Sequence, residues 1–110
     1  MPGKFELRKS SNGQYLFKLK AANGEPLLSS ETYLSKSGAE NGIKSVKENA
    51  PVDSRYERRT STNDQPYFVL KATNGEVIGT SEMYSSAAAS DKGIESVKLN
   101  APTAQVADLA

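Results

Sequence analysis

The sequence contains no cysteine, no histidine and no tryptophan in its 110 residues. The absence of cysteine excludes a disulfide framework and a thiol nucleophile, and the absence of histidine excludes a Ser–His or Cys–His catalytic pair. A metal could be held only by carboxylates and carbonyls, and no run of Asp and Glu has the spacing of a calcium loop. We therefore expect no enzymatic activity, no cofactor and no metal.

The chain also lacks an excess of charge of one sign and a long apolar run. Fourteen Lys and Arg face thirteen Asp and Glu, so the net charge is +1, which gives no electrostatic reason for binding nucleic acid or an anionic membrane. No segment approaches the ~20 apolar residues of a membrane span, and the first residues lack the apolar run of a signal peptide. We expect a cytoplasmic protein with no membrane partner, and we do not expect it to bind nucleic acid.

What the chain does contain is an internal repeat. A shift of 51 residues places 5–51 over 56–102 without a gap, and 24 of these 47 positions are identical. Two copies are too few for a solenoid, and a copy of about 50 residues has too small a core to fold alone. We expect one domain over 1–110, with repeat 1 at 4–54 and repeat 2 at 55–110, and a monomer with an internal pseudo-two-fold axis.

Each copy begins with two stretches of alternating apolar and polar residues, the pattern of strands with one buried face. In repeat 1 these are 5–8 and 15–21. Asn-Gly pairs, such as 23–24, are expected to form type I′ hairpin turns, in which both residues have positive φ. A short third strand is expected over 27–31, at a sheet edge because Pro26 has no N–H to donate.

A helix is expected after the three strands of each copy. Its apolar stripe in repeat 1 consists of Ala39, Ile43, Val46 and Ala50. Ser35 and Ser86 are suited to the N-cap. Asn49 and Asn100, each two residues before a proline, are suited to the left-handed position that ends a helix.

Gly42 and Gly93 interrupt the two expected helices at equivalent positions. A glycine inside a helix costs about 1 kcal/mol relative to alanine. Because both glycines lie beside the apolar stripe, we expect that the helices approach the sheet closely there.

The doubled pattern of Leu-Lys-Ala-x-Asn-Gly-Glu, Ser-Glu-x-Tyr-x-Ser and Gly-Ile-x-Ser-Val-Lys-x-Asn-Ala-Pro resembles the YegP-like proteins, which are small bacterial proteins of uncharacterised function. The resemblance covers essentially the whole chain. It implies that two units share one sheet and that a strand after each helix, here within 52–55 and 103–108, crosses to the other unit. The copies differ in their first strand, where repeat 2 has Arg58 at the position of the apolar Leu7 in repeat 1. No catalytic or binding residue comes with the resemblance.

The expected fold is therefore α+β: two tandem β-β-β-α(-β) repeats form one antiparallel sheet, with two helices on one face and the other face open.

Two sets of hydroxyl side chains precede the expected helix starts. They are Ser30, Tyr33 and Ser35 in repeat 1, and Ser81, Tyr84 and Ser86 in repeat 2. Such a set could bind a small anion, since a helix N-terminus offers free N–H groups and the positive end of the helix dipole. The alternative, which we favour because the set recurs in both copies, is an N-cap with a tyrosine that anchors the loop.

Charged residues alternate along the non-core face of the first two strands of each copy, and Lys20 and Lys71 are the binding candidates among them. With Leu16, Tyr67 and Val69 they could form a platform for a base or a protein partner. The favoured alternative is a solvated face with cross-strand ion pairs.

Three functions remain open. The first and favoured one is a non-enzymatic binding or structural module with an unidentified partner. The second is a weak nucleic-acid-binding protein that uses the open sheet face. The third is an enzyme with carboxylate or lysine chemistry. Converging carboxylates or a strongly perturbed lysine would favour the enzyme, and a continuous positive face with aromatic residues would favour nucleic acid.

Overall fold

The computed structural model describes residues 3–110 and contains two tandem copies of three strands and a helix, followed by one last strand. Repeat 1 consists of β1 (Lys4–Lys9), β2 (Tyr15–Lys20), β3 (Pro26–Ser29) and α1 (Lys36–Asn49). Repeat 2 consists of β4 (Tyr56–Thr60), β5 (Pro66–Lys71), β6 (Val77–Thr80) and α2 (Ala87–Asn100). The remaining elements are the 3₁₀ turns η1 (Asp53–Arg55) and η2 (Ala101–Thr103) and the strand β7 (Gln105–Asp108).

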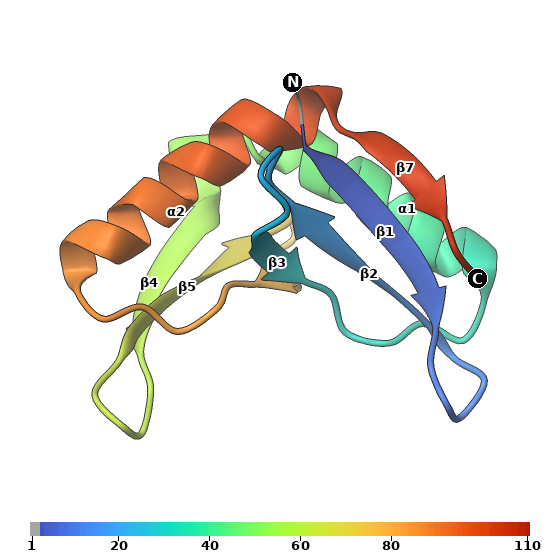
Figure 1. Cartoon of the computed structure of the whole chain (residues 1–110), viewed down its shortest axis with the longest axis horizontal. Helices are drawn as coiled ribbons and strands as arrows, with labels where there is room; N and C mark the ends of the chain where they lie inside the picture. The colour runs from blue at the N-terminus through green and yellow to red at the C-terminus, as the bar shows by residue number, and fades with distance from the viewer. Residues whose placement is uncertain (1–2) are drawn as a thin grey trace.

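All seven strands belong to one sheet in the order β4-β5-β6-β3-β2-β1-β7. The two halves of the sheet slope away from each other like an arch, and both helices run along its upper side (Figure 1). The core lies between helices and sheet, where the rings of Phe5, Phe17 and Phe68 are fully buried with Val46 and Val97. The predicted α+β fold is confirmed, with one difference: β7 runs parallel to β1, so the sheet is mixed.

The crossing strand that the resemblance implied for 103–108 is present, since β7 follows α2 of repeat 2 and pairs with β1 of repeat 1. The corresponding segment, 52–55, does not form a separate strand. It forms the turn η1 and then continues directly into β4. The reason is covalent, because the chain after α1 must supply the first strand of repeat 2 and cannot also lie beside it.

The prediction that the third strand lies at a sheet edge is wrong. β3 lies in the centre of the sheet, between β2 and β6. Pro26 is tolerated because it is the first residue of the strand and pairs with Lys20 on β2, whereas the contact with β6 is limited to Ser29 opposite Thr80. The missing N–H of Pro26 therefore interrupts no ladder between the repeats.

The two repeats also meet through unequal side chains at this junction. Leu28 in β3 and Gly79 in β6 are counterparts in the repeat, and Leu28 is buried against Gly79. A Cβ atom on Gly79 would lie 3.1 Å from Leu28 Cδ1. One large and one small residue therefore share the space near the pseudo-two-fold axis, where two leucines would be overpacked.

The hairpin turns differ from the predicted type I′. In the turn after β2, the N–H of Gly24 donates to the carbonyl of Ala21 at 2.9 Å, and Gly24 has φ +87°. Asn23 does not have a positive φ, so the turn is of type I with a left-handed glycine after it. In the turn after β4, Asp64 takes the glycine's place with φ 60°. Aspartate tolerates this conformation better than most residues.

The predicted N-caps are confirmed. Ser35 Oγ accepts a hydrogen bond from the N–H of Gly38 at 3.0 Å, and Ser86 Oγ accepts one from Ala89 at 3.1 Å. These bonds satisfy donors that the first turn of a helix leaves free.

The prediction that Asn49 and Asn100 adopt a left-handed conformation is wrong. Both are helical, and both side chains are buried. Asn49 Oδ1 accepts a hydrogen bond from Arg55 Nε at 3.0 Å, and Asn100 Oδ1 accepts one from the Gly3 N–H at 2.9 Å. Each asparagine thus ties a helix end to the segment that enters the first strand of the other repeat.

Candidate functional site

The serines of the two predicted hydroxyl sets serve the backbone. Ser30 Oγ accepts a hydrogen bond from the Phe17 N–H at 2.9 Å and donates to the carbonyl of Glu31. Ser81 Oγ has the same partners in repeat 2, with a 2.9 Å bond from the Phe68 N–H. The Ser30 and Ser81 hydroxyls therefore continue the pairing of the third strand with the second. Ser35 and Ser86 cap the helices.

The two tyrosines pack against the helix glycines. Tyr33 stacks on Phe17 with ring centroids 6.2 Å apart, and Tyr84 stacks likewise on Phe68. A Cβ atom on Gly42 would lie 2.5 Å from Tyr33 Oη and 2.9 Å from the Phe17 ring. The expected close approach of helix and sheet is therefore confirmed, and the tyrosines contribute to it. Burial, and then Glu31, raises the pKa of Tyr33, so its phenol stays neutral.

The helix-free face of the sheet carries a buried carboxylate surrounded by cations. Glu6 on β1 has a side chain only 7% exposed. Lys20 Nζ and Arg8 Nη2 each lie 3.1 Å from Glu6 Oε1, and Lys4 Nζ lies 3.4 Å from Glu6 Oε2. These contacts, those of Lys20 and Arg8 above all, lower the pKa of Glu6 to about 2. Glu6 is therefore ionised at any physiological pH.

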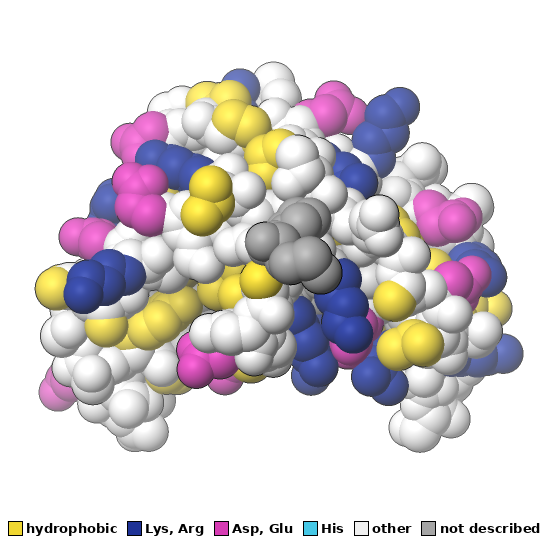
Figure 2. Space-filling model, turned by 45° about the horizontal axis from the view of Figure 1, so that its top comes forward, with side chains coloured by type: hydrophobic (Ala, Val, Ile, Leu, Met, Phe, Trp, Pro, Cys, Tyr) yellow, Lys and Arg dark blue, Asp and Glu magenta, His cyan; other side chains and the backbone are white. Residues whose placement is uncertain are grey.

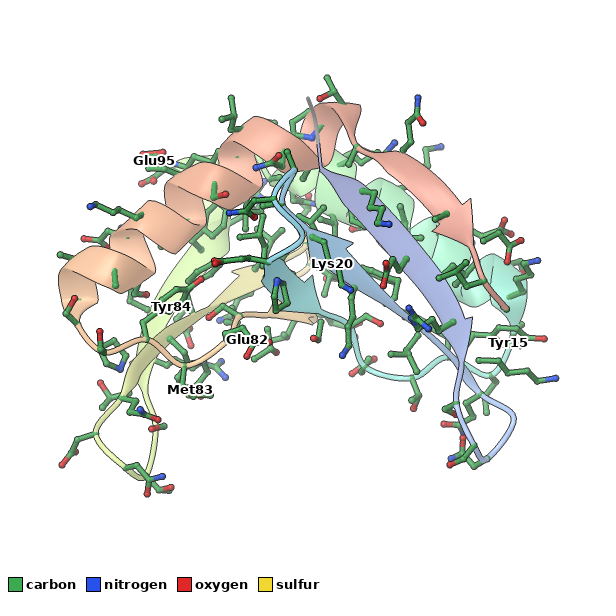
Figure 3. The ribbon with its side chains drawn as sticks, in the orientation of Figure 1. Tyr15, Lys20, Glu82, Met83, Tyr84 and Glu95 are labelled. Carbon is green, nitrogen blue, oxygen red and sulfur yellow. The ribbon has the colours of Figure 1, made fainter. Side chains whose placement is uncertain are left out.

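Lys18 adds a fourth cation beside Glu6, which it faces across the β1–β2 ladder. Among residues 3–110, no carboxylate lies within ion-pair distance of Lys18. We call this group the basic face: Lys4, Arg8, Lys18 and Lys20 around Glu6. Figure 2 shows several Lys and Arg side chains gathered near the middle of the view, and Figure 3 shows Lys20 within the arch.

The equivalent face of repeat 2 is less charged. Glu57 bonds Lys71 Nζ at 2.7 Å and also Arg59, but its side chain is 42% exposed. Val69, which is 1% exposed, stands where repeat 1 has Lys18. The two predicted candidates thus lie on opposite halves of the sheet, Lys20 among four cations and Lys71 in a single exposed cluster.

A half-open cavity of about 320 Å³ lies between the β2–β3 hairpin and α2. Tyr84, Glu82, Glu25 and Lys92 are among its lining residues, together with apolar groups such as Leu27. Burial, followed by the carboxylates of Glu82 and Glu25, raises the pKa of Tyr84, so its phenol can donate a hydrogen bond but not act as a base. Tyr84 and Glu82 lie on the same side of the arch (Figure 3).

Over residues 3–110, no three acidic side chains are grouped so that they could hold a metal ion. Within the same range, neither helix has the length and apolar character needed to cross a bilayer.

The arrangement defines a tandem-repeat α+β protein, and comparison with known proteins assigns its family. A family model described as a domain of unknown function, DUF1508, matches residues 10–57 and again 61–108. A UPF0339 protein of Shewanella oneidensis is 56% identical over 99% of both chains, and YegP of Escherichia coli K12 is 51% identical over 98% of both. The chain belongs to this family, as the resemblance implied, and the family description names no function.

Two solved structures confirm the fold. The solution NMR structure of UPF0339 protein SO3888 from Shewanella oneidensis superposes with a TM-score of 0.93 at 56% identity, covering 99% of this chain and 92% of that one. The solution NMR structure of yegP from Escherichia coli gives a TM-score of 0.94 at 50% identity, covering 99% and 94%.

One feature of the site could not be predicted from the sequence. The burial of Glu6 was not anticipated, although the sequence does show four cations at alternate positions on the first two strands. The asymmetry between the halves is present in the sequence: residues 1–52 carry a net charge of +3 and residues 53–110 one of −2, and Lys18 has the apolar counterpart Val69.

Proposed function

We propose that the protein is a non-enzymatic binding module and that it binds an anionic group on the basic face. The observation that carries the proposal is the arrangement of four cations around one carboxylate on a sheet face without a helix. Glu6 neutralises only one of the four. The remaining positive charge is held on two adjacent strands, which fixes its geometry better than a loop does.

Glu6 gives the cluster its shape. It holds Lys20 and Arg8 by 3.1 Å contacts, so both side chains are oriented before a ligand arrives. Orienting side chains in advance lowers the entropy lost on binding. Lys18 lies beside them and has no carboxylate partner within residues 3–110, so it is the cation most available to an anion.

Two observations support binding rather than catalysis. The hydroxyls of Ser30, Ser35 and their counterparts have backbone partners, so they offer no nucleophile beside a base. The pKa of Glu6 is lowered, whereas a carboxylate that acts as a general acid or base near neutral pH needs a raised one.

Weak nucleic-acid binding is a second candidate, favoured by the same four cations on one face. The position of the aromatic side chains argues against a sequence-specific role. The alternation places Tyr67 on this face, but Tyr67 lies on the other half of the sheet, away from the four cations. Single-stranded nucleic acid is usually held by several stacked aromatics in addition to charge.

Titration of the full chain with inorganic pyrophosphate, followed by backbone amide NMR shifts, tests the proposal. At about 50 mM salt we expect shifts centred on β1 and β2, weakened at about 150 mM because salt screens exposed charges. The Arg8→Gln, Lys18→Gln double variant should lose most of the response.

The Lys44→Gln, Lys92→Gln double variant is the matched control, because it removes the same charge from the exposed helix surfaces. It should retain the response. Shifts centred on the cavity beside Tyr84, or equal losses in the two double variants, would contradict the proposal.

A further inference from the structure

The first strand of repeat 2 has an open edge where the first strand of repeat 1 has a neighbour. β7 pairs in parallel with β1, and the Leu109 N–H donates to the Leu7 carbonyl at 2.8 Å. On the opposite side the strand order ends at β4, so within residues 3–110 no strand covers its outer edge (Figure 1). Arg58 is the counterpart of Leu7. Its backbone N–H and C=O therefore point away from β5, toward the open edge.

A cavity of about 190 Å³ lies beside this open edge. Arg58, Ala87, Ser90 and Asp91 are among its lining residues. In repeat 1 the end of β7 lies at the equivalent place: Asp108 pairs with Leu7, and its carboxylate bonds Lys36. Arg58 and Ala87 are the counterparts of Leu7 and Lys36, so the cavity corresponds to the position that Asp108 occupies in the other repeat.

Each of the two places has a cationic side chain, but a different element supplies it in each repeat. Repeat 1 supplies a lysine from the helix, Lys36, beside an apolar strand residue. Repeat 2 supplies Arg58 from the strand beside an alanine of the helix, Ala87. Arg58 Nε bonds Asp91 at 2.7 Å, but the Arg58 side chain is 57% exposed, and its guanidinium has further N–H groups for a second carboxylate.

Ser90 gives an independent sign of a ligand. It lines the cavity, its residue is 2% exposed, and its hydroxyl has no hydrogen-bond partner within residues 3–110. Its counterpart, Ala39, has no hydroxyl to satisfy. Buried hydroxyls usually have a partner, so the one at Ser90 is suited to a group that enters the cavity.

We propose that the open edge of β4 binds an extended peptide segment of a partner protein, parallel to β4, with an Asp or Glu side chain beside Arg58. This is how β7 binds β1, and it is a known mode of peptide recognition by an exposed sheet edge. A second copy of this chain is a poorer occupant, because antiparallel pairing of two β4 edges about Arg58 would place the two arginines opposite each other.

The probe is a peptide with the sequence of residues 104–110, blocked at both ends and added to the full chain. The Tyr56 and Arg58 amides should exchange with solvent more slowly when the peptide is present, and the Ser90 amide should shift. The tethered β7 should keep its own place on β1, because its effective concentration is in the millimolar range or above.

A peptide with Asn in place of Asp108 and the Arg58→Leu variant form a double-mutant cycle. Either change should weaken binding about fivefold, and the second change should then add little. Arg58→Leu restores the residue of repeat 1, so the fold should be kept. The proposal is overturned by an absence of slowed exchange at about 5 mM peptide, by slowed exchange at Leu7 instead, or by self-association of the chain through β4.

Discussion

The buried carboxylate of Glu6 should stabilise the fold, and Glu6→Gln measures by how much. Its pKa is lowered from 4.5 to about 2 by Lys20 first and Arg8 second. The full shift would be worth about 3 kcal/mol at 1.36 kcal/mol for each pKa unit. Lys4 and Arg8 are about half exposed, so solvent screening leaves about 1–2 kcal/mol. Urea unfolding of both proteins at pH 7, followed by circular dichroism, should show this loss.

The lowered pKa also determines how the stabilisation by Glu6 changes with pH. A lowered pKa means that the stabilisation is present above the unfolded-state value and is lost as the pH falls through the folded-state value. The difference between wild type and Glu6→Gln should therefore be constant above about pH 5 and should shrink between pH 4.5 and 2. Glu57→Gln, at the exposed counterpart, should cost much less. Equal losses in the two variants, or a difference that does not change with pH, would refute the reasoning.

Three further predictions concern packing, autonomy and charge. Gly42→Leu or Gly93→Leu should each destabilise the protein by about 1–3 kcal/mol in thermal unfolding, because the new side chain would overlap a tyrosine; an unchanged melting temperature would show that the helix can move away. Residues 1–54 alone should be unfolded or should pair with another copy, because half the sheet has an open edge and a small core; a stable monomer in sedimentation would contradict this. Binding to labelled single- and double-stranded DNA and RNA should be weak, with a logarithmic salt slope of about −3 to −4 at most for four cations; submicromolar affinity at about 150 mM salt, reduced by Lys20→Ala with Lys71→Ala, would overturn this expectation.

The parts of the fold that depend on local pattern could be predicted from the sequence. Alternation gave the strands, and Ser35 and Ser86 gave the helix starts, because capping involves only neighbouring residues. The role of Asn49 could not be predicted in this way, because its partner, Arg55, is brought close only when the chain turns through η1. An asparagine before a proline fits two interpretations, and a tertiary contact decides between them.

The central position of β3 could not be predicted from the sequence for the same reason, because it depends on the contact between the two repeats. Pro26 is typical of an edge strand, but β3 is central because the two repeats join through it. The difference between Leu28 and Gly79 was visible in the sequence, yet its meaning depends on knowing that these residues meet. At the outer edges, β7 covers β1, which carries Leu7, whereas within residues 3–110 no strand covers β4, which carries Arg58. Comparing the repeats shows where they differ, and the fold gives the reason.

The central claim is that the basic face binds an anionic ligand without transforming it. The direct test is to purify the full chain from its own cells in parallel with the Arg8→Gln, Lys18→Gln double variant, and to identify retained small molecules by mass spectrometry. We predict an anionic species that is enriched with wild type, is lost with the variant, is unchanged after incubation, and shifts the β1 and β2 amides when added back. A species that the variant retains equally, or that the protein converts into a product, would contradict the account.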